Sequence, residues 1–273
     1  MEIVIVMKLL FNSNPQKIKY FSEKLEDFMT YCRLIEDFDR SIIVAADVPN
    51  ISDLRRITLG TIEIPEVTAF KLGLTLGLGG LEKAVREVKD NSRPGVKTIF
   101  DLQKAGNDIP PMGVQFARDV ANAGCDAAIL FPFAGPKTQE AWTEACFKAG
   151  LEVLVGGIMT HEKFLVSEGG YISDDAPERI YRLGAQMGVK HFVVPGTKLN
   201  WVRKIKGFLT EELGEDEYEL TGPGFITQGG DLSECALIAG KRFHGIVGTA
   251  IYNNASVEDV RLAALSCVSQ IRA

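Results

Sequence analysis

The sequence predicts a (β/α)8 barrel of the TIM-barrel class with an extra helix near the N-terminus. Short runs of β-branched and apolar residues recur along the chain, each run ends near Gly, Asp or Pro, and amphipathic stretches lie between the runs. Near-continuous hydrophobicity within each run is typical of strands buried on both faces, as in a parallel sheet. Eight such units in a chain of 273 residues favour the barrel over the alternative, a doubly wound sheet.

The expected strands share this composition and lie at comparable intervals. They are residues 41–47, 69–73, 97–101, 126–131, 152–157, 191–196, 218–224 and 244–252. The stretches between them carry apolar residues at helical spacing. In residues 110–126 one apolar stripe is followed by Gly124, at the place where a glycine commonly ends a helix. Residues 15–36 are expected to form the extra helix before the first strand.

Composition limits the kind of protein this chain can be. No linker divides it, so we expect one domain over residues 1–273, with residues 1–40 as an N-terminal extension packed on the barrel. A net charge of −6 argues against a nucleic-acid surface, which needs a basic face. Five scattered cysteines without a CxxC favour reduced thiols in a cytoplasmic protein. There is no signal-peptide pattern, and no apolar run reaches the ~18 residues that span a membrane.

Polar residues gather at the expected carboxyl ends of the strands, where barrels of this class place their catalytic groups. They are Asp47, Lys71, Asp101, Thr160, Thr197, Lys198, Gln228 and Thr249. The most charged stretch is DLQKAGNDIP, in which Asp101, Lys104 and Asp108 place one ammonium between two carboxylates. A solvated surface turn is the alternative interpretation of that stretch. Lys71 is harder to explain in that way, because lysine is seldom buried without a partner.

Two glycine-containing loops indicate a phosphate site. Phosphate groups in these barrels usually bind at the loops that follow strands seven and eight, which here are residues 222–231 and 247–254. Gly224, Gly229 and Gly230 allow the backbone to approach an anion closely. Ordinary turn glycines are the alternative.

Taken together, these stretches resemble orotidine 5′-phosphate decarboxylases. The family's first strand resembles IIVAADVPN, and its second-strand K-x-G segment resembles AFKLGLTL. Its D-x-K-x-x-D-I-P signature is similar to FDLQKAGNDIP. Its phosphate loop is similar to GPGFITQGGD, and its V-G-R-x-I-Y motif to VGTAIY. The resemblance runs from about residue 41 to the C-terminus.

The resemblance implies decarboxylation of orotidine 5′-monophosphate to uridine 5′-monophosphate (UMP), a step of pyrimidine biosynthesis, without a cofactor or metal. It assigns the charged array to Lys71, Asp101, Lys104 and Asp108, with Lys104 protonating C6. Asp108 and Ile109 would reach into the neighbouring subunit, which implies a homodimer. The remaining substrate-binding residues that it implies are Asp47 at the ribose, Thr160 at the pyrimidine, Gln228 between base and phosphate, and Pro223, Gly229, Gly230, Gly248 and Thr249 near the phosphate.

The chain departs from the family pattern at three places. Its signature is spaced D-x-x-K-x-x-x-D, with one extra residue in each interval. Met112 stands where a serine or threonine is expected, and Thr249 replaces the phosphate-binding arginine. Loss of a charged contact of that kind costs ~1.5–3 kcal/mol unless another group replaces it. We expect Lys198, which follows the sixth strand, to be the replacement.

The extra residue before Lys104 creates a geometric requirement. Side chains alternate along a strand, so Asp101 and Gln103 would share a face and Lys104 would point away. Lys104 can join Asp101 only if the chain bulges or leaves strand geometry around Leu102 and Gln103. We expect Gly106 to absorb the second extra residue.

The chemistry explains why such an array would be needed. Removal of the C6 carboxylate leaves a carbanion that no π-system delocalises, so an adjacent ammonium must stabilise and then protonate it. Flanking carboxylates raise the pKa of that ammonium and keep it charged, and an aspartate beside the substrate carboxylate disfavours the ground state. Remote phosphate contacts would supply the binding free energy.

Two other functions remain open at this stage. Metal-dependent sugar-phosphate lyases and decarboxylases of the same superfamily place a glutamate where this chain has Lys71, and a cation there repels a metal. A non-catalytic nucleotide-binding relative would account for Thr249 and the altered spacing. It would leave the cluster of Lys71, Asp101, Lys104 and Asp108 without a purpose. His191 and His244 fall at strand starts, and we expect structural roles for both.

Overall fold

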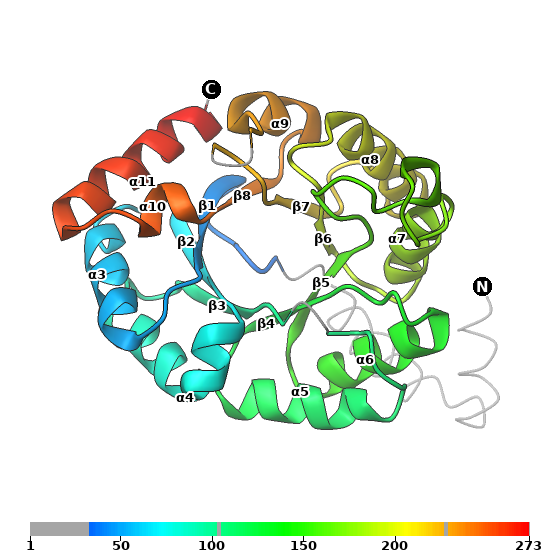
Figure 1. Cartoon of the computed structure of the whole chain (residues 1–273), viewed down its shortest axis with the longest axis horizontal. Helices are drawn as coiled ribbons and strands as arrows, with labels where there is room; N and C mark the ends of the chain where they lie inside the picture. The colour runs from blue at the N-terminus through cyan, green and yellow to red at the C-terminus, as the bar shows by residue number, and fades with distance from the viewer. Residues whose placement is uncertain (1–32, 103–104, 227–228, 273) are drawn as a thin grey trace, which may run out of the picture. The chain divides into compact units, whose positions relative to one another are not determined.

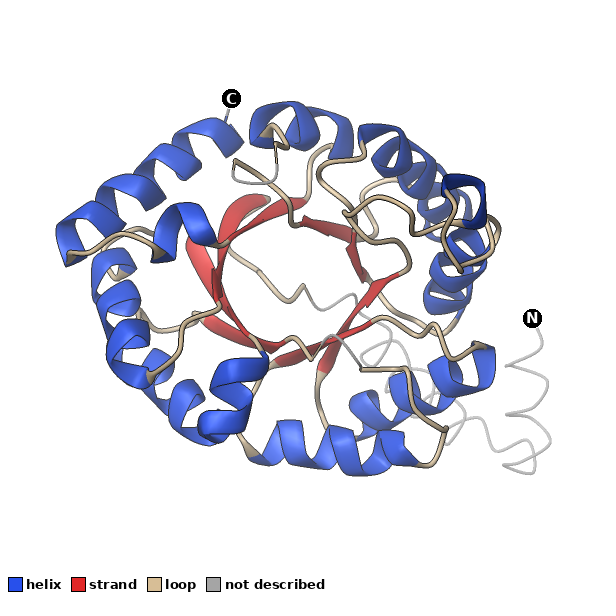
Figure 2. Cartoon of the chain, viewed as in Figure 1, coloured by secondary structure: helices blue, strands red, loops and turns tan. Residues whose placement is uncertain are grey.

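The computed structural model describes residues 33–102, 105–226 and 229–272. Within them, eight parallel strands close into a barrel, and each strand pairs with its neighbours in the sequence. The last strand also pairs with the first, since Ile43 lies opposite Ile246. Helices surround the strands (Figures 1 and 2). The predicted (β/α)8 barrel is confirmed, and the doubly wound sheet is excluded.

The elements alternate along the chain as the sequence predicts. The strands are β1 (Arg40–Ala46), β2 (Val67–Leu72), β3 (Lys97–Phe100), β4 (Ala127–Leu130), β5 (Glu152–Gly156), β6 (His191–Val193), β7 (Glu219–Gly222) and β8 (Phe243–Val247). The helices are α3 (Ile51–Thr61), α4 (Leu74–Asn91), α5 (Met112–Asn122), α6 (Pro136–Lys148), η1 (Val166–Glu168), α7 (Ala176–Gln186), α8 (Leu199–Leu213), α9 (Leu232–Ala239), α10 (Thr249–Tyr252) and α11 (Val257–Arg272). Among the described residues, no helix is long and apolar enough to cross a membrane.

The other strands begin and end within about three residues of the expected bounds, but two expected elements differ more. The last strand was predicted over residues 244–252, but β8 ends at Val247 and residues 249–252 form α10. Gly248 has φ −108° and ψ −97°, which lies outside the strand region and turns the chain into the helix. The extra N-terminal helix was predicted over residues 15–36. Residues 33–36 are not helical, and the rest of that segment lies outside the described residues, as does most of the expected extension 1–40.

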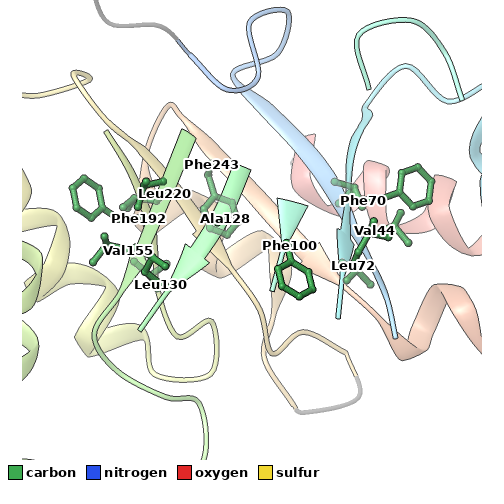
Figure 3. Packing of buried hydrophobic residues seen from close by; sticks show 14 of the residues in the cluster. Val44, Phe70, Leu72, Phe100, Ala128, Leu130, Val155, Phe192, Leu220 and Phe243 are labelled. Carbon is green, nitrogen blue, oxygen red and sulfur yellow. The ribbon is translucent and has the colours of Figure 1, made fainter. Parts of the chain in front are cut away.

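Alternation along the strands produces two apolar layers. One set of strand side chains packs with the helices in a large buried cluster, and Figure 3 shows Val44, Phe70 and Phe100 in it. The alternate set fills the interior of the barrel; it includes Ile43 and Ile99. Fully burying one such side chain contributes about 1.5–3 kcal/mol. Since both faces are buried, each strand is apolar along almost its whole length, which is why the strands could be located from sequence.

The amino-terminal end of the barrel holds a buried polar cluster. His191 Nδ1 lies 3.0 Å from a Glu219 carboxylate oxygen. His244 Nδ1 lies 2.7 Å from the Ser41 hydroxyl, and Arg33 Nε donates to Glu219 at 2.8 Å. His191 begins β6 and His244 is the second residue of β8. Both histidines therefore lie at the barrel end opposite the strand termini where catalytic groups are expected.

Candidate active site

A cavity of about 340 Å³ opens among the residues that follow the carboxyl ends of the strands. This volume is within the range of small-molecule sites. Eight of the residues predicted from sequence line it: Asp47, Lys71, Asp101, Thr160, Pro223, Gly224, Gly248 and Thr249. Lys71 lies in β2, and the others lie in the loops that follow β1, β3, β5, β7 and β8 or at the start of α10. The barrel thus brings together positions that are far apart in the chain.

Lys71 is at the centre of a charged cluster in this cavity. Its Nζ lies 2.9 Å from Asp101 Oδ2 and 3.5 Å from Asp47 Oδ2. Strand register explains the arrangement, because Lys71 is paired with Ala45 on one side and with Ile99 on the other. Asp47 and Asp101 each lie two residues beyond those partners and so share the inward face.

The cluster holds Lys71 in its charged form. Burial by itself lowers the pKa of the ammonium, but the charges and hydrogen bonds of Asp101 and Asp47 outweigh that effect and raise the pKa above its ordinary value. The side chain is only 10% exposed, whereas that of Asp47 is 48% exposed. Asp47 can therefore face a ligand while Asp101 and Lys71 form the floor beneath it.

The chain leaves strand geometry directly after Phe100. Asp101 and Leu102 lie outside β3, and the Ala105 amide donates to the Leu102 carbonyl at 2.7 Å in a turn. Gly106 has φ +83°, a backbone conformation that favours glycine. These features agree with the expected irregularity. Gln103 and Lys104 themselves lie outside the described residues, so the position of the predicted acid stays a prediction.

Asp108 and Ile109 lie outside this cavity. Asp108 is exposed and its Oδ1 accepts from the Ile109 amide at 2.7 Å, while Ile109 is 61% exposed. Two side chains of α6 hydrogen-bond to their backbone carbonyls: Thr138 Oγ1 donates to Asp108 O, and Trp142 Nε1 donates to Ile109 O. The backbone is fixed on the protein, and both side chains remain available at the surface.

The loop after β7 is tightly folded. The Gly230 amide donates to the Gly224 carbonyl at 3.1 Å, and the Ile226 amide donates to the Gly230 carbonyl at 3.0 Å. A side chain on Gly230 would lie 2.7 Å from Gly224 O, so only glycine fits there. Gly224 lines the cavity, but Gly229 and Gly230 line a separate open hollow beside α11. Gln228 lies outside the described residues.

Lys198 does not line the cavity. Its Nζ contacts both carboxylate oxygens of Glu168, at 3.1 and 3.2 Å. The cavity wall near the end of β8 is instead made by Thr249 and Tyr252, whose hydroxyls lie 3.2 Å apart. The sequence analysis missed Tyr252 as a site residue. Reading residues 249–252 as a helix would have placed it one turn from Thr249, on the same face.

Comparisons with known proteins identify relatives in sequence and in fold. No protein-family model matches the chain. An orotidine 5′-phosphate decarboxylase of Pyrococcus abyssi is 31% identical over 212 residues, which cover 78% of this chain and 91% of the relative. An orotidine 5′-phosphate decarboxylase of Methanosphaera stadtmanae is 29% identical over 216 residues, which cover 78% of this chain and 89% of the relative. A solved structure with a similar fold is the orotidine 5′-monophosphate decarboxylase from Methanocaldococcus jannaschii complexed with inhibitor BMP. It matches with a TM-score of 0.72 and 21% sequence identity, and the match covers 86% of this chain and 99% of that one. This similarity shows a common fold.

Proposed function

This chain belongs to the orotidine 5′-phosphate decarboxylase family, and we propose that it decarboxylates orotidine 5′-monophosphate to UMP. The observation that best supports the proposal is the cluster in which Lys71 lies 2.9 Å from Asp101 and 3.5 Å from Asp47. The cluster lies at the floor of a cavity and Asp47 is 48% exposed toward that space, and catalytic sites commonly gather perturbed charged groups in this way, which favours catalysis over binding alone.

The proposed reaction uses the cluster in two ways. The fixed anion of Asp101 lies where it can disfavour the carboxylate of the bound substrate, and Lys71 keeps that anion oriented. As the C6–carbon bond breaks, carbon dioxide leaves and its bonding electrons remain on C6. The ammonium that we assign to Lys104 stabilises this carbanion and transfers a proton to it. Solvent then reprotonates the lysine.

The remaining predicted residues complete the proposed site. Thr160 lines the cavity, and its carbonyl accepts from Thr197 Oγ1 at 3.2 Å, which holds the backbone in place. Thr160 would contact the pyrimidine. Asp47, half exposed, would contact the ribose. The phosphate would lie against Pro223, Gly224 and Gly248, whereas the predicted Gly229 and Gly230 line the separate hollow beside α11. Lys198 stays a predicted phosphate ligand that would have to leave Glu168.

We also propose that the active protein is a homodimer. Ile109, Met112 and Val114 are 61%, 43% and 56% exposed and follow one another closely, which makes an uncovered apolar surface at the start of α5. A second copy that covers this surface would receive Asp108 and Ile109 in its own cavity. The outward direction of both side chains supports this arrangement, because neither can contribute to the cavity of its own subunit as placed.

Complementation between two inactive variants tests the dimer. Asp108→Ala and Lys104→Ala would each abolish turnover alone. In a mixed dimer one site receives both mutations and the other receives neither, so random mixing should restore about a quarter of the wild-type activity per subunit. Absence of any recovery in verified mixed dimers would contradict the shared site.

A second candidate function is a nucleotide-binding protein without catalysis, which the replacement of arginine by Thr249 favours. Spectrophotometric turnover of orotidine 5′-monophosphate separates the two. The decarboxylase predicts turnover in the presence of a chelator, and loss of turnover in Lys104→Ala. A metal-dependent sugar-phosphate enzyme is disfavoured, because the Lys71 ammonium lies between the two carboxylates and would repel a metal ion.

A further inference from the structure

The cavity wall after β7 and β8 contains no charged side chain among the described residues. The three charged side chains that line the cavity, Asp47, Lys71 and Asp101, all belong to the cluster at β1, β2 and β3. Phosphate groups in barrels of this class bind after strands seven and eight. A phosphorylated ligand would therefore meet a neutral wall. That wall consists of Pro223, Gly224, Phe225, Gly248, Thr249 and Tyr252.

Two cations near this wall are held by other groups. Lys198 forms its ion pair with Glu168 at 3.1 Å. Arg56 donates to the Tyr252 carbonyl at 3.1 Å and contacts Asp53 Oδ1 at 3.2 Å. Arg56 thus supports the backbone of α10 from outside the cavity. Neither cation lines the cavity, so the absent arginine has no charged substitute at this wall within the described part of the chain.

The hydroxyls of Thr249 and Tyr252 form an ordered pair at this wall. They lie one helical turn apart on the same face of α10, and Thr249 Oγ1 donates to Tyr252 Oη at 3.2 Å. The Tyr252 amide donates to the Gly248 carbonyl at 3.1 Å, which fixes the backbone of Tyr252 relative to β8. A tyrosine hydroxyl that accepts a hydrogen bond still has its own proton to donate. The pair therefore presents a donor to the cavity.

We propose that the Tyr252 hydroxyl, oriented by Thr249, donates a hydrogen bond to the phosphate of the bound nucleotide and takes the role of the absent cation. This inference rests on the proposed function, since it assumes a 5′-phosphorylated nucleoside as the ligand. Tyr252 is the binding residue, and Thr249 is a positioning residue. A hydrogen bond from a neutral donor to an anion corresponds to roughly tenfold to hundredfold in affinity.

Calorimetric titration with UMP and with uridine isolates the phosphate contribution. Tyr252→Phe should weaken UMP binding roughly tenfold to hundredfold and leave uridine binding within about twofold. Thr249→Val should weaken UMP binding in the same direction by a smaller factor, and Thr249→Ser should restore it. The matched control is Tyr171→Phe, because Tyr171 is 99% exposed and lies outside this cavity. Lys198→Ala tests the competing assignment, in which Lys198 leaves Glu168 and binds the phosphate.

Each alternative result has a defined meaning. Unchanged UMP binding in Tyr252→Phe, or equal losses for UMP and uridine, would overturn the inference. So would a wild type that binds UMP no more tightly than uridine, since no phosphate contact would then exist. A tenfold loss in Lys198→Ala would assign the phosphate to that lysine instead. If Tyr252 selects for phosphate but the wild type does not decarboxylate orotidine 5′-monophosphate, the proposed activity fails and the phosphate contact stands.

Discussion

Removing the ammonium of Lys71 should lower the stability of the fold as well as the rate of the reaction. Lys71→Met keeps most of the side-chain volume and deletes the charge. At the 2.9 Å separation from Asp101, the direct attraction is roughly 6 kcal/mol at an effective dielectric constant of 20. Desolvation of two buried charges offsets part of it. Because breaking a buried ion pair commonly costs 3–5 kcal/mol, we expect the free energy of unfolding to fall by about 3 kcal/mol.

A double-mutant cycle tests this origin of the effect. Urea unfolding, followed by tryptophan fluorescence and circular dichroism, would give the free energies of unfolding for Lys71→Met, Asp101→Asn and the double variant. The double variant should be more stable than the sum of the single losses predicts, because neither charge then remains buried. Lys148→Met is the matched control. Lys148 forms an exposed pair with Glu144 at 2.7 Å, and its loss should cost less than about 0.5 kcal/mol. Equal effects at Lys71 and Lys148, or simple additivity in the cycle, would refute the reasoning.

Two further predictions concern stability. Burial by itself lowers the pKa of His191, but Glu152 and Glu219 outweigh that effect and raise the pKa to about 9. Protonated His191 therefore contributes its full stabilisation of the fold below pH ~6.5, and up to ~3 kcal/mol of it is lost as the pH rises through about 9. The free energy of unfolding measured against pH should show this loss. An unchanged pH profile in His191→Gln would contradict it. Ile226 is a β-branched residue with φ +63°, a backbone conformation that is strained for such a side chain. Ile226→Gly should therefore raise the free energy of unfolding by about 1 kcal/mol. A lower free energy of unfolding would show that no strain resides there.

The strands and the charged cluster were predictable from sequence for the same physical reason. A strand buried on both faces must be apolar along its length, so a charged residue at its end stands out from its surroundings. Lys71, Asp47 and Asp101 were located in that way, and parallel register then brings them together. The end of the last strand was not predictable, because GTAIY has strand-like composition and only the backbone angles at Gly248 show the turn into α10.

The surroundings of Lys198 and Tyr252 depend on distant contacts that a linear pattern does not contain. Lys198 follows β6 as predicted, but its partner Glu168 comes from the loop after β5, thirty residues earlier. Tyr252 belongs to the cavity only because residues 249–252 form a helix. Lys198 was identified as a candidate from sequence and Tyr252 was not. In both cases the contacts that decide the role of the residue are set by the tertiary structure.

The central claim is that the barrel catalyses decarboxylation of orotidine 5′-monophosphate without a metal. Its most direct test is the loss of substrate absorbance with purified protein in the presence of a chelator, for the wild type and for Lys104→Ala. We predict turnover by the wild type and a rate at least about a hundredfold lower for the variant. A folded wild type that binds UMP but leaves the substrate unchanged would contradict the claim.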